Sequence, residues 1–215
     1  MDQADVILEQ LAGQTCVPEE QLKQLPRWAL VALAVRGARR AQPLFLTDWP
    51  DAPQEFQQTI ENALALTEAS AANGTEHPDL KEAASQAGKT ATTAANLTAR
   101  FASFTVTFAA VNAAHVATAE NTDNAVAFVQ AATDSCHKSA TFASAKFALF
   151  KSLQPGTVAT ALRQALQRDF DTLLERARTK AWTTTTPVDM ASLGPLWPDG
   201  APRGFPGPRA STFAR

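Results

Sequence analysis

The sequence contains no tyrosine, two cysteines and nine glycines among its 215 residues. The cysteines, Cys16 and Cys136, lie far apart, so the sequence lacks the dense cysteine spacing of a disulfide-stapled secreted domain. A chain of this length can bury a sizeable core without such cross-links. We therefore expect two free structural thiols in a protein of the reducing cytosol.

An excess of charge of one sign is missing as well. The 19 basic and 21 acidic residues give a net charge of −2, which offers no electrostatic attraction for nucleic-acid phosphates or anionic membranes. The N-terminus carries acids where a signal peptide carries positive charge, and no stretch approaches the roughly 20 apolar residues of a membrane span. We therefore predict a cytoplasmic protein whose partners include neither nucleic acid nor a membrane.

Recognised catalytic and cofactor motifs are also absent from the sequence. It contains no G-x-G-x-x-G, no Walker loop, no H-E-x-x-H, no G-x-S-x-G and no paired C-x-x-C. We therefore predict no cofactor and no catalytic residue, and we favour a function other than catalysis. The alternative of an enzyme with an unrecognised active site stays open, and it requires a deep polar pocket whose ionisable groups have shifted pKa values.

Alanine is what the sequence has in abundance. Roughly a fifth of the residues are Ala, well above average usage, and the β-branched residues are mostly Thr and Val scattered among them. Because Ala is the strongest helix former, this composition favours helix over sheet. The predicted fold class is all-α, a bundle of about five to seven helices followed by an irregular tail rich in proline and glycine.

Breaker residues and apolar spacing divide the chain into helices. Pro43 ends one helix, and Asn73-Gly74 closes the next with a left-handed cap. Between residues 80 and 153 we predict two long helices that divide near 120–124, with a further weak point at Gly88. Their phenylalanines recur at helical spacing and are predicted to be core: Phe101, Phe104, Phe108, Phe128, Phe142, Phe147 and Phe150. The other predicted helices cover about 2–11, 19–25, 26–42, 54–72 and 157–181.

From Trp182 the composition changes to runs of Thr, Pro and Gly, which exclude a continuous helix. We therefore divide the chain into a helical domain, residues 1–181, and a tail, residues 182–215. Two interpretations of the tail stay open. In the favoured one, Trp197 and Phe205 pack back onto the domain as an ordered strap; in the other, they form a proline-framed aromatic motif for the groove of a partner.

Three arginines stand together near the end of the predicted helix 26–42. Arg40 follows Arg36 by four positions, so the two share one helix face and can grip a carboxylate or phosphate. The candidates for partner binding are therefore Arg36, Arg39, Arg40, Trp197 and Phe205. In the alternative, these arginines are solvated or pair with acids that follow along the chain, namely Asp48, Asp51 and Glu55.

The remaining site-like residues lie in the two long helices, at His115, Asp134, Cys136 and His137. In an antiparallel hairpin that turns near Asn121, His115 faces roughly residue 127 and Cys136 faces roughly residue 106. His115 and Cys136 are then on the order of 13 Å apart along the axis, which is too far to share a tetrahedral zinc. We therefore predict no metal site, and polar side chains that are satisfied by the core or by solvent.

Residues 26–74 carry a pattern of their own. The segment W-A-x-x-A-x-x-x-R-G-A-R-R-A-x-P-L-F is followed by W-P-D-A-P and by an Ala/Leu helix that ends in A-A-N-G. This pattern resembles the opening helices of bacterial immunity proteins of the Imm-five-like group. The resemblance implies a helical protein that acts by stoichiometric binding, with a toxin or another conflict-system component as its partner. It covers about a quarter of the chain, does not extend to the tail and supplies no catalytic residues.

These observations together predict a non-catalytic helical module that binds another protein, such as a bacterial immunity or adaptor protein. Besides the enzyme, a structural homo-oligomer remains an alternative, because Ala- and Thr-lined helices pack closely and can form a self-interface.

Overall fold

The computed structural model describes residues 16–96, 101–148, 157–202 and 205, and these residues form helices and irregular segments without any strand. The predicted all-α bundle is therefore confirmed. The helix expected at residues 2–11, the side chains of Phe147 and Phe150 and the tail beyond Phe205 lie outside what the structure describes. In chain order the helices are α2 (Glu19–Leu22), α3 (Arg27–Ala41), α4 (Pro43–Asp48), α5 (Gln54–Asn73), α6 (Leu80–Ala95), α7 (Phe101–Thr118), α8 (Thr122–Ala148), α9 (Thr157–Thr179) and the short 3₁₀ helix η1 (Ala191–Leu193).

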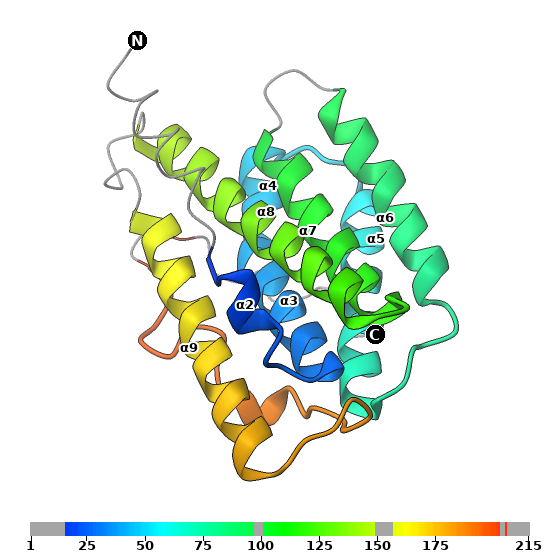
Figure 1. Cartoon of the computed structure of the whole chain (residues 1–215). Coiled ribbons are helices and arrows are strands. Elements are labelled where there is room, and N and C mark those ends of the chain that lie inside the picture. The colour runs from blue at the N-terminus through cyan, green and yellow to red at the C-terminus, as the bar shows by residue number, and fades with distance from the viewer. Residues whose placement is uncertain (1–15, 97–100, 149–156, 203–204, 206–215) are drawn as a thin grey trace.

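Helix α3 forms the centre of the bundle. All its residues from Trp28 to Val35 are buried, because α5, α7, α8 and α9 pack around it. Figure 1 shows α9 on one side of α3 and the pair α5 and α6 on the other. Gly37 permits a close approach, since a Cβ there would lie 3.1 Å from Cδ2 of Leu166 on α9 and 3.5 Å from Sγ of Cys136 on α8. The small residues of α3 therefore allow neighbouring helices to pack closely against it.

Helices α7 and α8 form the antiparallel hairpin that the sequence predicts. The rings of His115 and Phe128 lie 5.1 Å apart, and the Ser139 hydroxyl donates to the Thr105 hydroxyl at 2.7 Å. Asn121 caps the start of α8, because its side-chain oxygen accepts a hydrogen bond from the backbone N–H of Asn124 at 2.8 Å. The predicted register, in which His115 faces roughly residue 127, is therefore correct to about one residue.

Helix α7 is also the helix among the described residues that is long and apolar enough to cross a membrane, judged by length and composition alone. Its 18-residue window has a mean hydropathy of 1.2, and 72% of that window is buried inside the bundle. Core helices commonly have these properties.

One predicted boundary is wrong. Helix α6 continues through Gly88 without a break, and the division between α6 and α7 falls after Asn96 instead. The space beside Gly88 is open, so nothing in the packing requires a glycine there, and the helix simply absorbs its lower propensity. By contrast, Gly74 adopts a left-handed φ of +66° after α5, and Thr75 N–H donates back to the Ser70 carbonyl at 3.3 Å, which confirms the predicted cap.

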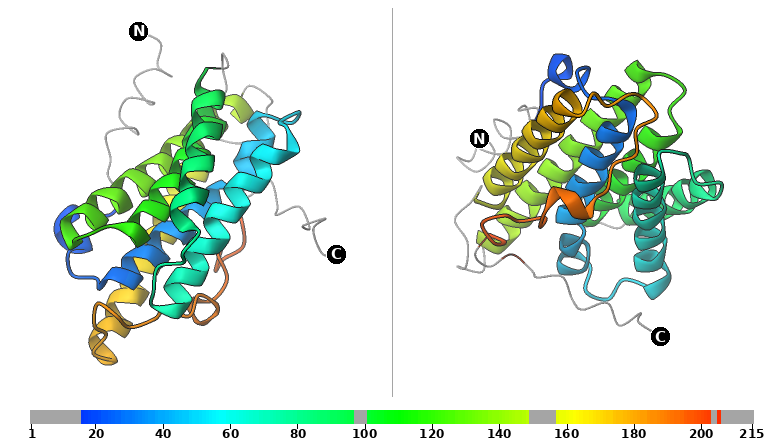
Figure 2. Two further views of the ribbon diagram at one scale, coloured as in Figure 1. Left: turned by 90° about the vertical axis from the view of Figure 1, so that its right-hand side faces the viewer. Right: turned by 90° about the horizontal axis from the view of Figure 1, so that it is seen from below.

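After α9 the chain doubles back across the bundle. We call residues 183–202 the strap; Figure 2 shows it crossing beneath α3 and running beside α9. The strap passes the end of α5, where Val188 N–H donates to the Ala71 carbonyl at 2.8 Å. A Cβ on Gly74 would lie 2.7 Å from the carbonyl oxygen of Thr185, so this crossing also requires the glycine. The strap and Phe205 place these partly buried side chains against the core: Met190, Leu193, Trp197 and Phe205.

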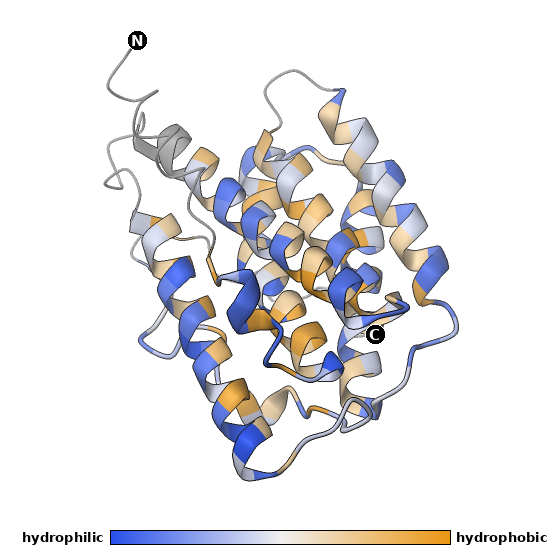
Figure 3. Ribbon diagram, in the orientation of Figure 1, coloured by the Kyte–Doolittle hydropathy of each residue, from blue (hydrophilic) through white to orange (hydrophobic). Residues whose placement is uncertain are grey.

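Helix α9 packs against α8 and α3. Leu162, Leu166 and Leu173 are buried on one face at helical spacing, while Gln164, Asp171 and other polar residues of the opposite face are exposed. Figure 3 shows this alternation of hydrophilic and hydrophobic segments along α9, next to the strongly hydrophobic visible part of α3.

Candidate functional site

Arg36 and Arg40 of α3 face the interior rather than solvent. They are 3% and 1% exposed, because α9 and the strap cover the helix face that they share. The exposed arginine patch that the sequence suggests is therefore absent at these two positions. Their spacing does bring them to one carboxylate, as the sequence indicates, but that carboxylate is Asp169 of this chain rather than a partner's group.

Asp169 lies between the two guanidinium groups. Nε of Arg36 donates to its Oδ2 at 2.9 Å, and Nη1 of Arg40 lies 2.6 Å from the same oxygen. All three side chains are buried, at 4%, 0% and 6% side-chain exposure for Arg36, Arg40 and Asp169. Two buried cations thus share one buried anion.

The strap supplies carbonyl oxygens to the same arginines. Nη1 and Nη2 of Arg36 donate to the carbonyls of Gly194 and Pro195, both at 3.0 Å, and Nε of Arg40 donates to the carbonyl of Leu196 at 2.6 Å. Gly194 adopts φ +78°, a conformation that favours glycine and turns the strap chain over the arginines. Arg36 and Arg40 therefore bind the strap through its main-chain carbonyls.

Trp197 and Phe205 complete this cover. The guanidinium carbon of Arg40 lies 5.7 Å from the centre of the Trp197 ring, and the Phe205 ring meets Trp197 edge-on at 5.3 Å. A cation over an indole is attracted by the negative face of the ring. Both aromatic candidates from the sequence are thus engaged within the chain.

Arg40 is incompletely satisfied in this arrangement. Its Nη1 forms an ion pair with Asp169 at 2.6 Å, and its Nη2 has no hydrogen-bond partner among the described residues. Burial lowers the pKa of Arg40, attraction to Asp169 opposes that shift, and nearby Arg36 adds to it. Buried donors are usually paired, so the Nη1–Nη2 edge of Arg40 is an exception that calls for an explanation.

Arg39, the third arginine, points to α5 instead. Its Nε and Nη2 both donate to Glu68 at 2.8 Å, and its Nη1 donates to Glu61 at 2.6 Å and to Gln42 at 3.0 Å. Burial alone would lower the pKa of Arg39, but these carboxylates raise it above its ordinary value. The actual acids are Glu61 and Glu68, which lie about two and about four helical turns beyond Glu55, the last of the acids suggested by the sequence.

A second polar cluster lies where α8 meets α9. Nη2 of Arg163 lies 3.1 Å from Nε2 of His137, and burial together with the Arg163 charge lowers the pKa of His137 to about 4. The Cys16 thiol donates to the Thr133 carbonyl at 3.8 Å, and burial raises its pKa to about 12. Burial likewise raises the pKa of Cys136, so both thiols stay protonated and unreactive at neutral pH.

Both cysteines are free and buried, as expected from their spacing. His115 is half-buried against Phe128, and burial lowers its pKa; burial also raises the pKa of Asp134. Within the part of the chain that the structure describes, no three His, Cys, Asp or Glu side chains are grouped to hold a metal ion.

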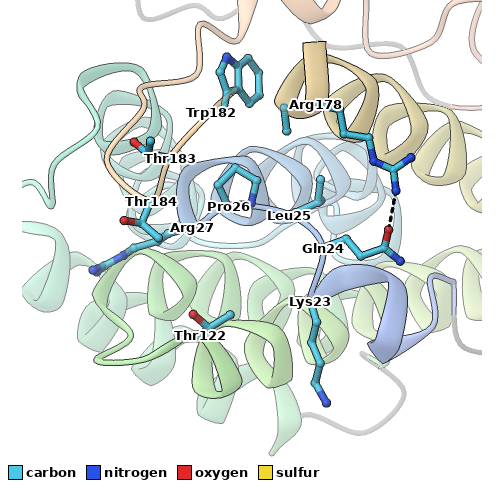
Figure 4. A pocket seen from close by; sticks show the side chains of 11 residues that line it. Lys23, Gln24, Leu25, Pro26, Arg27, Thr122, Arg178, Trp182, Thr183 and Thr184 are labelled. Carbon is cyan, nitrogen blue, oxygen red and sulfur yellow. Dashed lines mark hydrogen bonds between the residues drawn. The ribbon is translucent and has the colours of Figure 1, made fainter. Parts of the chain in front are cut away.

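An open pocket of about 560 Å³ lies where the start of α3 meets the start of α8 and the end of α9 (Figure 4). Arg178 donates to the side-chain oxygen of Gln24 across it at 2.8 Å, and Lys23 pairs with Glu19 at 2.8 Å. Two of the three cations that line the pocket, Arg178 and Lys23, are therefore already paired within the chain. The pocket is lined by Lys23, Gln24, Leu25, Pro26, Arg27, Thr122, Ala177, Arg178, Trp182, Thr183 and Thr184.

Four phenylalanines form a surface on α7 and α8 that was predicted to be core. Phe101, Phe108 and Phe142 are 62%, 40% and 37% exposed, so that prediction is wrong for these three. Phe101 stacks on Phe142 at 5.6 Å, and the half-buried Phe104 stacks on Phe108 at 5.7 Å. We call Phe101, Phe104, Phe108 and Phe142 the phenylalanine surface.

Sequence reasoning missed Asp169 and the exposure of these phenylalanines. The signal for Asp169 was present, since a carboxylate at helical spacing from Leu166 and Leu173 stands on an apolar face, where it requires a cation. No such signal distinguishes Phe101 from Phe104, because α7 is apolar on all sides.

Comparisons with protein-family models, with curated proteins and with solved structures found no match to this chain.

Proposed function

We propose that this chain is a non-catalytic protein-binding module, as expected of a bacterial immunity or adaptor protein. The observation that carries the proposal is the phenylalanine surface. Three large aromatic side chains stand exposed side by side, and contiguous apolar patches of this kind mark interaction sites in soluble proteins. Phenylalanine is also enriched where protein interfaces are buried.

The expected occupant is an apolar helix face of a different protein. The phenylalanine surface lies on two packed helices, α7 and α8, and its four side chains stack on each other in two pairs. They form a surface rather than the walls of a deep groove. A partner helix can lay its apolar side across such a surface, with anchors spaced one helical turn apart.

The test is a tagged pull-down from the native lysate, with stoichiometry measured by mass spectrometry. We expect one near-stoichiometric partner for the unaltered protein and its loss for the double variant Phe101→Gln with Phe142→Gln. The matched control is Glu175→Gln with Thr179→Gln, two exposed positions near the end of α9, which adds the same amide groups close to the start of α8 rather than to Phe142.

A homo-oligomer is the second candidate, because the same apolar surface could be covered by another copy of the chain. Light scattering measures the mass of the purified protein. A dimer that the Phe101→Gln, Phe142→Gln variant converts to monomer would favour the homo-oligomer over a foreign partner. If the protein is a monomer and the Phe101→Gln, Phe142→Gln variant still captures the same partner as the control variant, the phenylalanine surface is not the contact.

A further inference from the structure

The buried arginine site differs from the phenylalanine surface in its chemistry. It holds two guanidinium charges, on Arg36 and Arg40, and one carboxylate, on Asp169. The strap adds only neutral carbonyl oxygens to this site. Charges that are nearly excluded from water are usually balanced, so an excess of one cation is an unusual arrangement.

The unbalanced group has a defined shape. Both terminal nitrogens of Arg40 are buried: Nη1 forms an ion pair with Asp169 at 2.6 Å, and Nη2 makes no hydrogen bond among the described residues. These two nitrogens form one edge of the guanidinium plane, which matches the two oxygens of a carboxylate in a bidentate pair. The lowered pKa of Arg40 agrees with a cation whose compensation is incomplete.

The strap that covers this edge is held mainly by the two arginines themselves, through the carbonyls of Gly194, Pro195 and Leu196. Among the described residues, Val188 is the strap position whose main chain bonds the main chain of the helical domain. Arg168 pairs with Asp199, and Arg176 donates to Ser192, but these contacts are at the surface. A carboxylate that engages the arginines would replace the contacts that hold the strap, and a segment left with few buried contacts opens at a low free-energy cost.

We propose that the arginine site beneath residues 194–197 of the strap binds a carboxylate side chain from an acidic segment of a partner protein, and that the strap closes this site in the free chain. The carboxylate takes the Nη1–Nη2 edge of Arg40 and balances the second cation. The strap carbonyls are displaced, and Trp197 leaves the face of the guanidinium. The inference rests on the proposed function in so far as the acid belongs to a protein partner; it does not use the phenylalanine surface.

The test uses the full chain and a hexaglutamate peptide, with hexaglutamine as the uncharged match. Trp197→Ala removes the aromatic cover and leaves both arginines in place. We expect Trp197→Ala to bind hexaglutamate at least about tenfold more tightly than the unaltered protein, a difference of about 1.4 kcal/mol. Hexaglutamine is expected to bind neither protein.

Two substitutions in the Trp197→Ala background identify the site. Arg40→Met keeps an apolar side chain of similar length and should abolish the gain in affinity. Arg39→Met removes a neighbouring cation that faces α5 and should retain the gain. Equal binding by the unaltered protein and Trp197→Ala, no binding by either, or a gain that survives Arg40→Met would each overturn the proposal.

Chemical modification gives a second readout that does not depend on the folding of the Arg40→Met variant. Phenylglyoxal modifies accessible arginines, and mass mapping locates the modified residue. Arg40 should be protected in the unaltered protein, modified in Trp197→Ala and protected again by hexaglutamate. Modification of Arg40 that hexaglutamate leaves unchanged would contradict the proposal. If hexaglutamate does not bind Trp197→Ala, while the Phe101→Gln, Phe142→Gln variant still loses its partner, this inference is wrong and the proposed function is retained.

Discussion

Asp169 is the residue on which the arginine site depends. It stands on the apolar face of α9, and its single carboxylate orients Arg36 and Arg40 so that Nη1 and Nη2 of Arg36 and Nε of Arg40 reach strap carbonyls. A buried ion pair is weak evidence of net stabilisation, because removing both charges from water offsets much of their attraction. Its clearer effect is positional, since it fixes which strap carbonyls the arginines reach.

His137 predicts how stability changes with acid. Its pKa in the folded protein is about 4, below its value of 6.5 in the unfolded chain, because burial and Arg163 disfavour the charged ring. Between these two pH values the unfolded chain binds the extra proton, so stability falls as pH falls from 6.5 to 4. The slope contributed by this one residue approaches about 1.4 kcal/mol per pH unit within that window.

Urea unfolding at a series of pH values measures this slope. His137→Gln removes the titration while keeping a polar side chain, so its stability should depend less steeply on pH between 4 and 6.5. His115→Gln serves as a comparison at a half-buried histidine whose pKa burial also lowers. Identical slopes for the unaltered protein and His137→Gln would show that His137 is not held neutral by the fold.

At the scale of the helix, Gly88 and Gly74 show two different effects of glycine. Gly88 only lowers helix propensity, whereas Gly74 is required by the local backbone geometry. Gly88 lies inside α6 with open space beside it, so Gly88→Ala should raise the free energy of unfolding by about 0.5 to 1 kcal/mol. Gly74 has a positive φ, and a Cβ there would lie 2.7 Å from a strap carbonyl. Gly74→Ala should therefore lower the free energy of unfolding by roughly 1 to 2 kcal/mol or more.

Urea titrations followed by circular dichroism at 222 nm test this pair. The same substitution is expected to change stability in opposite directions, because one glycine is replaceable and the other is required. Loss of stability at Gly88, or tolerance of alanine at Gly74, would mean that the local geometry described for that helix is incorrect.

At the scale of the whole molecule, the strap joins elements distant in the sequence. It ties the end of α5, through Ala71, to α3 and α9. Trp197→Ala removes a half-buried ring that contacts Arg40 and Phe205, at a cost on the order of 2 kcal/mol. The melting temperature should fall by roughly 4 to 8 °C, at 2 to 4 °C per kcal/mol for a chain of this size.

A thermal melt followed by circular dichroism measures this shift. Trp197→Phe is the control, because it keeps an aromatic ring over Arg40 and should retain most of the stability. An unchanged melting temperature for Trp197→Ala would mean that Trp197 does not anchor the strap, and the aromatic motif of the tail would then be free for a partner.

The sequence by itself determined where most of the helices lie and how α7 and α8 are aligned in their hairpin. Alanine content, proline positions and the Asn73-Gly74 cap act within a few residues, so the helices α3, α5 and α9 and the turn at Asn121 follow from local chemistry. The facing of His115 and Phe128 also follows, because a tight turn between two helices fixes which residues oppose each other.

Only the tertiary structure decided which faces are covered. Arg36 and Arg40 are charged, and Phe101 and Phe142 are apolar, yet the former pair is buried and the latter exposed. The reason is that burial depends on segments far away in the chain: the strap and Asp169 cover the arginines, whereas no described segment fully covers the phenylalanines. Local periodicity identifies a helix face, but long-range packing decides what that face meets.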